Sequence, residues 1–193
     1  MRVRRKGLLG VGVVALAAVL GVAMVSSASA ADNRDEVRFN LTPSSPQLAQ
    51  CIPHAKVTVE VDLQTEKTGR DTFEINVSGM PAKTSFTVFL LETPVAPFGA
   101  AEYIGDFTTD RKGRARQKLT LIVQEAFAST LVNGQRQRVD LNHVGVWFAD
   151  PADDDFCFGP GGGPVTPFDG DNTAGAQVLN TAPFLPNAPL PAP

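Results

Sequence analysis

The chain has little of the chemistry on which most catalytic and metal sites depend. Its 193 residues include only two histidines, two cysteines, one tryptophan and one tyrosine. A hydrolytic triad needs a histidine beside an exposed serine and a carboxylate, and a zinc site needs about four nitrogen, sulfur or oxygen ligands. His54, His143 and one pair of cysteines supply too few such groups. The sequence therefore favours a protein without catalytic residues and without a cofactor.

Long hydrophobic runs are also absent, except at the N-terminus. Basic side chains at positions 2, 4, 5 and 6 precede the apolar run Leu8–Val25, and Ala28–Ala30 then gives a small-x-small pattern. This order is typical of a cleaved secretory signal peptide, so we expect residues 1–30 to form a signal helix that is removed on export. An uncleaved membrane anchor is the alternative, because the apolar run could almost span a bilayer.

Positive charge is scarce in the rest of the chain. The first 30 residues hold four of the 17 basic side chains and none of the 20 acidic ones, so the mature chain has a formal charge of −7. Nucleic acids and anionic lipids are both recognised largely through lysine and arginine. We therefore expect no nucleic-acid partner and no stable membrane anchor after cleavage.

The two cysteines, Cys51 and Cys157, both lie in the mature part of the chain. In an oxidising compartment an even pair predicts a disulfide, and here only one pairing exists. Neither cysteine belongs to a C-x-x-C motif or lies beside a histidine at ligand spacing, which argues against a redox or metal role.

Alternation of apolar and polar residues predicts short strands over most of residues 31–181. Ser85–Leu91 is apolar on both faces and is expected near the centre of a sheet, as is Val139–Ala149, which carries the only tryptophan. Gln124–Leu131 is the one segment predicted as a short helix. About eight strands at this spacing predict an all-β domain, namely an antiparallel immunoglobulin-like β-sandwich. The proline-rich tail, residues 182–193, is expected to be extended and disordered.

Two long loops, Pro94–Tyr103 and Asp150–Asp171, are the candidates for a ligand surface. The candidate ligand residues in and beside them are Phe98, Tyr103, Asp106 and Asp169. Exposed aromatic rings of this kind stack on sugars or peptides, whereas the simpler interpretation is that they close the end of the sandwich.

Clustered carboxylates raise two alternatives. Asp153, Asp155, Asp169 and Asp171 supply oxygen ligands of the kind that bind Ca²⁺ weakly in extracellular modules, but their spacing does not match an EF-hand. The pattern favours a solvated acidic loop over a calcium site. A carboxylate-based hydrolase, pairing Asp106 with Asp153 or Asp169, is the enzymatic alternative.

A series of short motifs extends from Gly79 to Thr181, over about two-thirds of the mature chain. In order, they are Pro97–Gly99, Gly105–Asp110 with Gly113, His143–Phe148, Pro151–Asp153, Cys157, Thr166–Gly170 and Ala174–Thr181. These motifs resemble a family of uncharacterised secreted bacterial proteins, chiefly of actinobacterial type. The resemblance implies a secreted domain of unknown function and carries over no catalytic residue.

Together, these patterns predict a secreted, non-enzymatic β-sandwich that binds an unknown ligand, or has a structural role, in the cell envelope or the medium.

Overall fold

The computed structural model describes residues 35–167 and 172–191, so the predicted signal peptide lies outside the described part of the chain. No helix among the described residues is long and apolar enough to cross a membrane. The elements are β1 (Glu36–Pro43), α1 (Pro46–Cys51), β2 (Lys56–Asp62), α2 (Thr65–Thr68), β3 (Asp71–Ser78), β4 (Ser85–Leu91), β5 (Ala101–Thr108), β6 (Ala115–Leu121), β7 (Phe127–Val132), β8 (Gln135–Asp140), β9 (His143–Phe148), the 3₁₀ turn η1 (Pro151–Asp154), α3 (Asp155–Phe158), β10 (Gln177–Asn180) and the 3₁₀ turn η2 (Ala182–Phe184).

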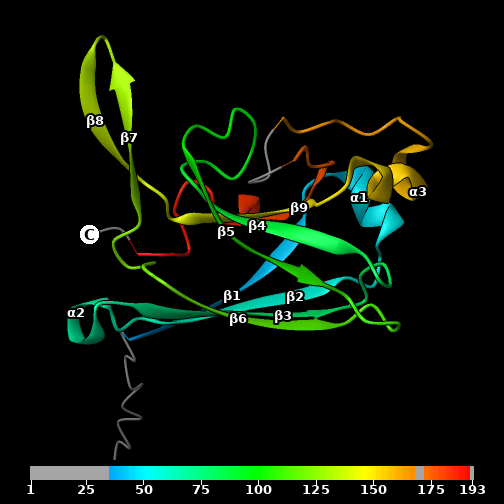
Figure 1. Cartoon of the computed structure of the whole chain (residues 1–193), viewed down its shortest axis with the longest axis horizontal. Helices are drawn as coiled ribbons and strands as arrows, with labels where there is room; N and C mark the ends of the chain where they lie inside the picture. The colour runs from blue at the N-terminus through cyan, green and yellow to red at the C-terminus, as the bar shows by residue number, and fades with distance from the viewer. Residues whose placement is uncertain (1–34, 168–171, 192–193) are drawn as a thin grey trace, which may run out of the picture. The chain divides into compact units, whose positions relative to one another are not determined.

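Eight of these strands form one antiparallel sheet in the order β5-β4-β9-β10-β1-β2-β3-β6 (Figure 1). Strand β1 belongs to both halves of the sheet, because residues 36–41 pair with β2 whereas Thr42 and Pro43 pair with β10. The two edge strands approach each other: a Cβ on Gly105 of β5 would lie 3.1 Å from Cδ2 of Leu119 on β6. The prediction of an all-β antiparallel domain is confirmed, and the sheet is nearly closed. The finer immunoglobulin-like arrangement is not confirmed.

The core lies inside this nearly closed sheet. Val57, Val59 and Val61 of β2 are buried, while the residues between them are at most partly covered, as the alternation predicts. Strands β4 and β9 differ, because nearly every residue in them is buried, whichever face of the sheet it points to. Their inward residues pair across the strands, as Phe86 does with Phe148. Their outward residues must therefore be covered by something other than the main core, and that cover forms the candidate site below.

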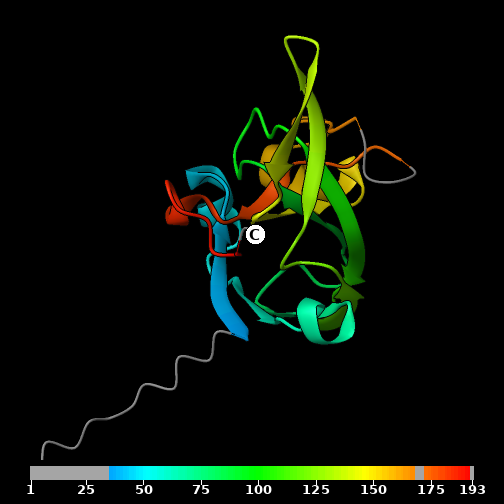
Figure 2. The same ribbon diagram turned by 90° about the vertical axis from the view of Figure 1, so that its left-hand side faces the viewer.

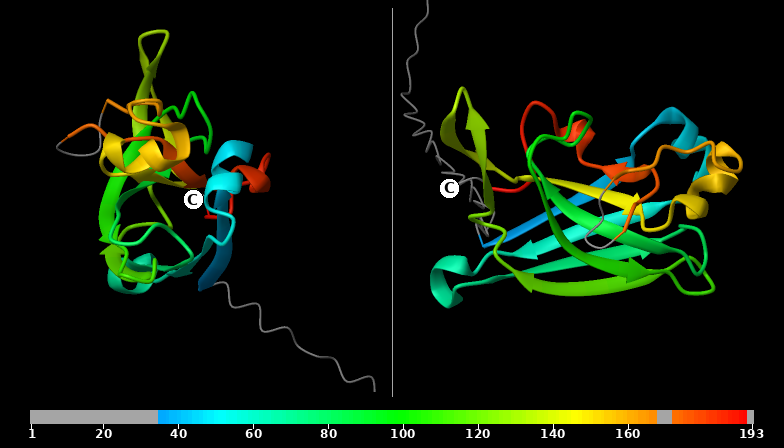
Figure 3. Two further views of the ribbon diagram at one scale, coloured as in Figure 1. Left: turned by 90° about the vertical axis from the view of Figure 1, so that its right-hand side faces the viewer. Right: turned by 45° about the horizontal axis from the view of Figure 1, so that its top comes forward.

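The predicted disulfide between Cys51 and Cys157 is present. It joins α1 to α3, two short helices that lie side by side at one end of the sheet (Figure 3). Ser45 begins α1 by accepting a hydrogen bond from the N–H of Leu48, whose side chain is buried. The bridge thus fixes the segment after β1 to the segment after β9.

The segment predicted as a helix, Gln124–Leu131, instead enters a β-hairpin. Strands β7 and β8 pair antiparallel and stand away from the eight-stranded sheet (Figures 1 and 2). Asn133 and Gly134 form the two-residue turn, both with positive φ, as an Asn-Gly hairpin requires. The helix prediction was wrong because the segment considered, residues 124–131, ended before the Asn-Gly turn and before the paired strand that follows it.

The C-terminal tail also differs from the prediction, since the part described, residues 182–191, folds against the domain. Leu190 is buried in the core, and its N–H donates to the carbonyl of Asn142. Phe184 adds a second apolar contact, since its ring meets that of Phe39 edge to face at 5.8 Å. The proline content removes backbone donors from the tail but leaves these apolar contacts.

A buried carboxylate, Asp71, ties three segments together at the start of β3. Its oxygens accept hydrogen bonds from the backbone of Gln64, from the backbone and hydroxyl of Thr65, and from the backbone of Val123 and Gln124, at 2.6–2.8 Å. Burial alone would raise the pKa of Asp71, but these donors stabilise the ionised form and lower the pKa below its ordinary value.

Replacing both cysteines by serine is expected to lower the free energy of unfolding by about 4–5 kcal/mol, because the bridge closes a loop of 106 residues. Urea denaturation at neutral pH measures the loss, and reduction of the unchanged protein should reproduce it. A loss below about 1 kcal/mol would show that the bridge contributes little to stability.

Replacing Asp71 by Asn is expected to cost about 3 kcal/mol at neutral pH, because five donors lose a charged acceptor. Because folding lowers the pKa of Asp71, its stabilisation is complete above the unfolded pKa of about 3.9 and is lost as pH falls through the folded pKa. The difference in free energy of unfolding between the unchanged protein and the variant should therefore shrink as the pH falls from about 6 to about 2. Asp62→Asn, at an exposed neighbouring position, is the control, and a difference independent of pH would contradict the assignment.

Candidate functional site

The outward face of β4 and β9 carries a small apolar cluster that is separate from the main core. Phe89 and Leu91 of β4, Trp147 of β9 and the nearby Ala174 are buried in it, with Phe98 packed against them. Outward residues of two central strands would otherwise leave a large apolar patch in water. Two loops cover the face instead, and they cover it incompletely.

The first loop, residues 92–100, connects β4 to β5 and is held by its own hydrogen bonds. The N–H of Glu92 donates to the carbonyl of Ala100, and the N–H of Ala100 returns a bond to Oε2 of Glu92 at 2.8 Å. The hydroxyl of Thr93 donates to the carbonyl of Pro97. A further bond from Gln177 Nε2 to the carbonyl of Pro94 ties the loop to β10. Phe98 is thereby held above the sheet rather than left on a free loop.

The second covering segment lies between α3 and β10. Thr166 and Ala174 exchange two backbone hydrogen bonds, and the Thr166 hydroxyl donates to the carbonyl of Gly175. The N–H of Gly175 donates in turn to the carbonyl of Phe148 on β9. This wall is therefore attached to the same strand that carries Trp147.

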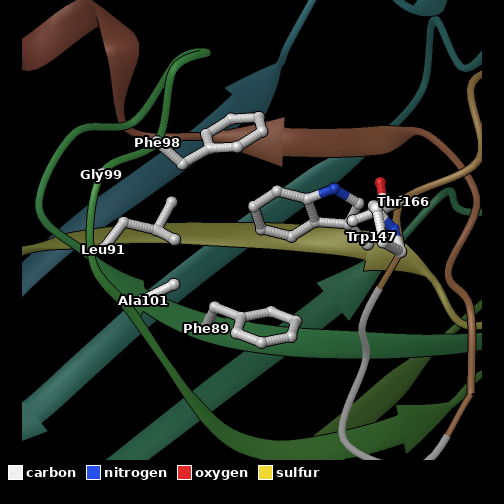
Figure 4. Close-up of a pocket in the computed structure, with 8 residues that line it drawn as sticks. Phe89, Leu91, Phe98, Gly99, Ala101, Trp147 and Thr166 are labelled. Carbon is white, nitrogen blue, oxygen red and sulfur yellow. The ribbon is translucent and has the colours of Figure 1, made fainter.

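A hollow of about 260 Å³ remains between the two loops and the sheet (Figure 4). Phe98 and Phe89 stand on opposite sides of it with Trp147 between them, and Leu91 and Ala101 lie across from the indole (Figure 4). The residues that line it are Phe89, Leu91, Phe98, Gly99, Ala101, Trp147, Thr166 and Pro167. A second hollow of about 440 Å³ shares Phe98, Trp147 and Thr166 with the first.

Trp147 contacts the rings of both Phe89 and Phe98 edge to face. The Trp147 ring centroid lies 5.1 Å from that of Phe98 and 5.2 Å from that of Phe89. The indole lies across Gly145, where an added Cβ would approach Trp147 Cζ3 to 2.5 Å and Leu91 Cδ1 to 2.7 Å. Only glycine leaves room for the indole at this position, so the backbone itself forms part of the floor.

Tyr103 and Asp106 extend the same outer face toward the edge of the sheet. The register pairs Phe89 with Tyr103 and Thr87 with Asp106, and paired residues share a face. The rings of Phe89 and Tyr103 meet edge to face, and the Tyr103 hydroxyl donates to Oδ2 of Asp106 at 2.8 Å. Of the predicted ligand residues, Phe98, Tyr103 and Asp106 therefore come together around this face, while Asp169 lies outside the described residues.

The predicted acidic loop has a structural use. Asp150 caps η1 by accepting from the N–H of Ala152, and Asp155 accepts from the N–H of Gly161. Burial raises the pKa of Asp153, with the nearby charges of Asp150 and Asp154 adding to the rise. Asp171, like Asp169, lies outside the described residues, and no group of three or more histidine, cysteine or acidic side chains within 35–167 and 172–191 is placed to hold a metal ion.

Asp154 departs most from the expectation of a solvated loop, because only 1% of it is exposed. Its Oδ2 accepts from the N–H of Ala176, while Oδ1 has no hydrogen-bond partner among the described residues. Gly163 and Gly175 lie directly against the carboxyl. Burial raises the pKa of Asp154, the bond from Ala176 opposes the rise, and the charge of Asp155 adds to it.

His143 occupies the first position of β9, is buried, and bonds through Nδ1 to the hydroxyl of Thr181 at 2.9 Å. Burial lowers its pKa, so the ring is neutral at physiological pH. His143 is thus a hydrogen-bonded residue of the core.

Sequence reasoning missed Trp147, Phe89 and Leu91 as parts of a site. It assigned them to the core because the strands that carry them are apolar on both faces. A signal was available in the sequence, because the outward residues of such strands need a cover. The loop that immediately follows β4, residues 92–100, carries the aromatic residue Phe98.

Asp154→Asn keeps an oxygen for the N–H of Ala176 and removes the buried charge. Because folding raises the pKa of Asp154, the contribution of its protonated form is complete below the unfolded pKa of about 3.9 and is lost as pH rises through the folded pKa. The variant should therefore melt at a higher temperature than the protein at about pH 7, with the gain vanishing near pH 3. Thermal melts from about pH 3 to about pH 7 test the sign of this change in melting temperature. A variant that is less stable than the unchanged protein at both pH values would contradict the prediction.

Comparisons of the chain with models of protein families, with curated proteins and with solved structures each found no match. The resemblance to secreted actinobacterial-type proteins therefore stays a prediction, and function has to be argued from the geometry of the site.

Proposed function

We propose that this protein is exported and acts as a non-enzymatic binding module, receiving an apolar group of an extracellular or envelope ligand in the aromatic hollow. The observation that carries the proposal is the lining itself: three aromatic rings and Leu91 surround an open hollow of about 260 Å³. Binding pockets are typically concave, apolar and largely formed before the ligand arrives, with few polar groups to orient it.

Export is supported by the signal pattern of residues 1–30, and the bridge between Cys51 and Cys157 fits an oxidising compartment. A binding role is favoured over a catalytic one by the chemistry of the lining. Its one side-chain hydroxyl, that of Thr166, donates to the carbonyl of Gly175, and the other lining side chains are apolar. These groups can bury and orient a ligand, but they offer no acid, base or activated nucleophile to it.

The hollow is held open by the scaffold and does not depend on a ligand to shape it. Hydrogen bonds within residues 92–100 fix Phe98, and the bonds of Thr166 and Gly175 fix the opposite wall to β9. A ligand therefore enters a preformed site, which reduces the entropy lost on binding.

The proposal is tested with the protein's own reporter, because Trp147 is the only tryptophan and lines the hollow. Titration with a neutral aromatic probe, benzyl alcohol, should change its fluorescence saturably with a Kd in about the millimolar range, as expected for so small a ligand. Phe98→Ala should raise the Kd about tenfold through lost apolar contact.

Ala101→Phe fills the hollow without removing a wall, so it should abolish the response while the circular dichroism spectrum stays unchanged. Phe127→Ala, at an exposed ring on the separate β7–β8 hairpin, is the matched control and should bind like the unchanged protein. No saturable response in the unchanged protein, or an equal response in Ala101→Phe, would refute the proposed site.

A further inference from the structure

Basic side chains are distributed unevenly between the segments that build the hollow and the rest of the domain. The described residues 85–108, 143–167 and 172–180, which include every segment that builds the hollow, contain no lysine and no arginine. The same segments carry Glu92, Glu102 and Asp106 around the β4–β5 hairpin. The nearest basic side chains in the sequence, Lys83 and Arg111, flank the opposite end of that hairpin, where Ser85 pairs with Thr108. Among the described segments that build the hollow, the only formally charged side chains are therefore acidic.

Glu92 brings one of these charges to the rim. A Cβ on Gly99, a residue of the lining, would lie 2.2 Å from Oε2 of Glu92, so the carboxylate rests directly against that wall. Gly99 has a φ of +67°, and only glycine accepts both this conformation and this close contact. The single hydrogen bond from Ala100 leaves most of the acceptor capacity and the charge of the carboxylate available.

Asp106 adds a second charge on the same face. It lies beyond Phe89, and its carboxylate is held by the hydroxyl of Tyr103, whose ring packs on Phe89. His143, on β9, is neutral. No cation from the described elements around the hollow offsets the two carboxylates.

We propose that the ligand group that enters the hollow is an organic cation, specifically an ammonium whose nitrogen carries alkyl substituents. This inference rests on the proposed binding function and adds the chemical class of the ligand. Aromatic faces attract cations through the ring quadrupole, and the effect grows where water is excluded. Three rings together with acids at the rim match such a group in both shape and charge.

The lining also decides between alkylated and primary ammonium. A primary ammonium carries three N–H donors, and each would lose its water on entering a hollow whose walls are almost entirely apolar. An alkylated nitrogen presents methyl groups instead of donors, so it contacts the rings without leaving a donor unsatisfied. Anionic ligands are disfavoured because they would meet Glu92 and Asp106 with no compensating base.

The test compares three probes of nearly the same shape by Trp147 fluorescence at low ionic strength. Choline carries a trimethylammonium group, 3,3-dimethylbutan-1-ol replaces its nitrogen by carbon, and 3,3-dimethylbutanoate carries a negative charge. Choline should bind about tenfold more tightly than the alcohol, and the butanoate more weakly than both. Raising the salt concentration should reduce the preference, because the rim charges are only partly shielded from solvent.

Matched variants assign the preference to the rim. Glu92→Gln and Asp106→Asn each keep an acceptor for the existing hydrogen bond and remove one charge. Together they should lower the ratio of the alcohol Kd to the choline Kd about threefold or more. The alcohol should bind as before, which would show that the hollow is intact. Glu66→Gln, an exposed position on α2, changes the net charge as much as either single substitution and should leave the ratio unaltered.

The outcomes separate the two proposals. If the alcohol and choline bind equally well in the unchanged protein, the cation inference is overturned and the apolar binding site stands. If none of the probes binds, the proposed function fails as well. A preference that survives Glu92→Gln with Asp106→Asn and is instead reduced by Glu66→Gln would reflect net charge, and would likewise overturn the assignment to the rim.

Discussion

The burial of β4 and β9 on both faces is the constraint on which the rest of this structure depends. A nearly closed sheet needs only its inner face covered, and most of its strands meet that need by alternation. These two adjacent strands also place aromatic and aliphatic residues outward, so an external cover has to exist. The long loops before β5 and β10 supply it. The hollow lies between two separately anchored loops that cover a row of large rings.

Carboxylates also serve as structural acceptors of backbone hydrogen bonds in this fold. Asp71 gathers the backbone of two segments around an ionised side chain, and the charge is stabilised because every oxygen faces several donors. Asp154 has one donor in a buried position crowded by glycines, so its charge is poorly compensated. Two aspartates with nearly equal burial thus have pKa values shifted in opposite directions. Donor count, rather than burial, decides the sign.

How much of this follows from the sequence depends on whether the relevant signal is local. Strand periodicity is a local signal and the two cysteines allow a single pairing, and both predictions are confirmed. The β7 segment was predicted as a helix because its partner strand lies beyond the window that was weighed. The tail contacts the domain through Phe184 and Leu190, and these long-range contacts are not revealed by any periodicity. Phe98 and Tyr103 were found as candidates, whereas Trp147 could be placed with them only once the sheet register was known.

The segregation of charge gives the site a chemical bias that geometry alone does not. An aromatic hollow by itself accepts any apolar group of suitable size, since dispersion and desolvation do not depend on the sign of a distant charge. Acids at the rim change this, because a cation entering a poorly hydrated hollow keeps part of its electrostatic stabilisation, while an anion loses its water and gains nothing. Specificity is a difference between affinities, so under this proposal the repulsion of anions contributes to it together with the attraction of cations. The absence of lysine and arginine from the surrounding segments is thus as much a part of the site as the rings themselves.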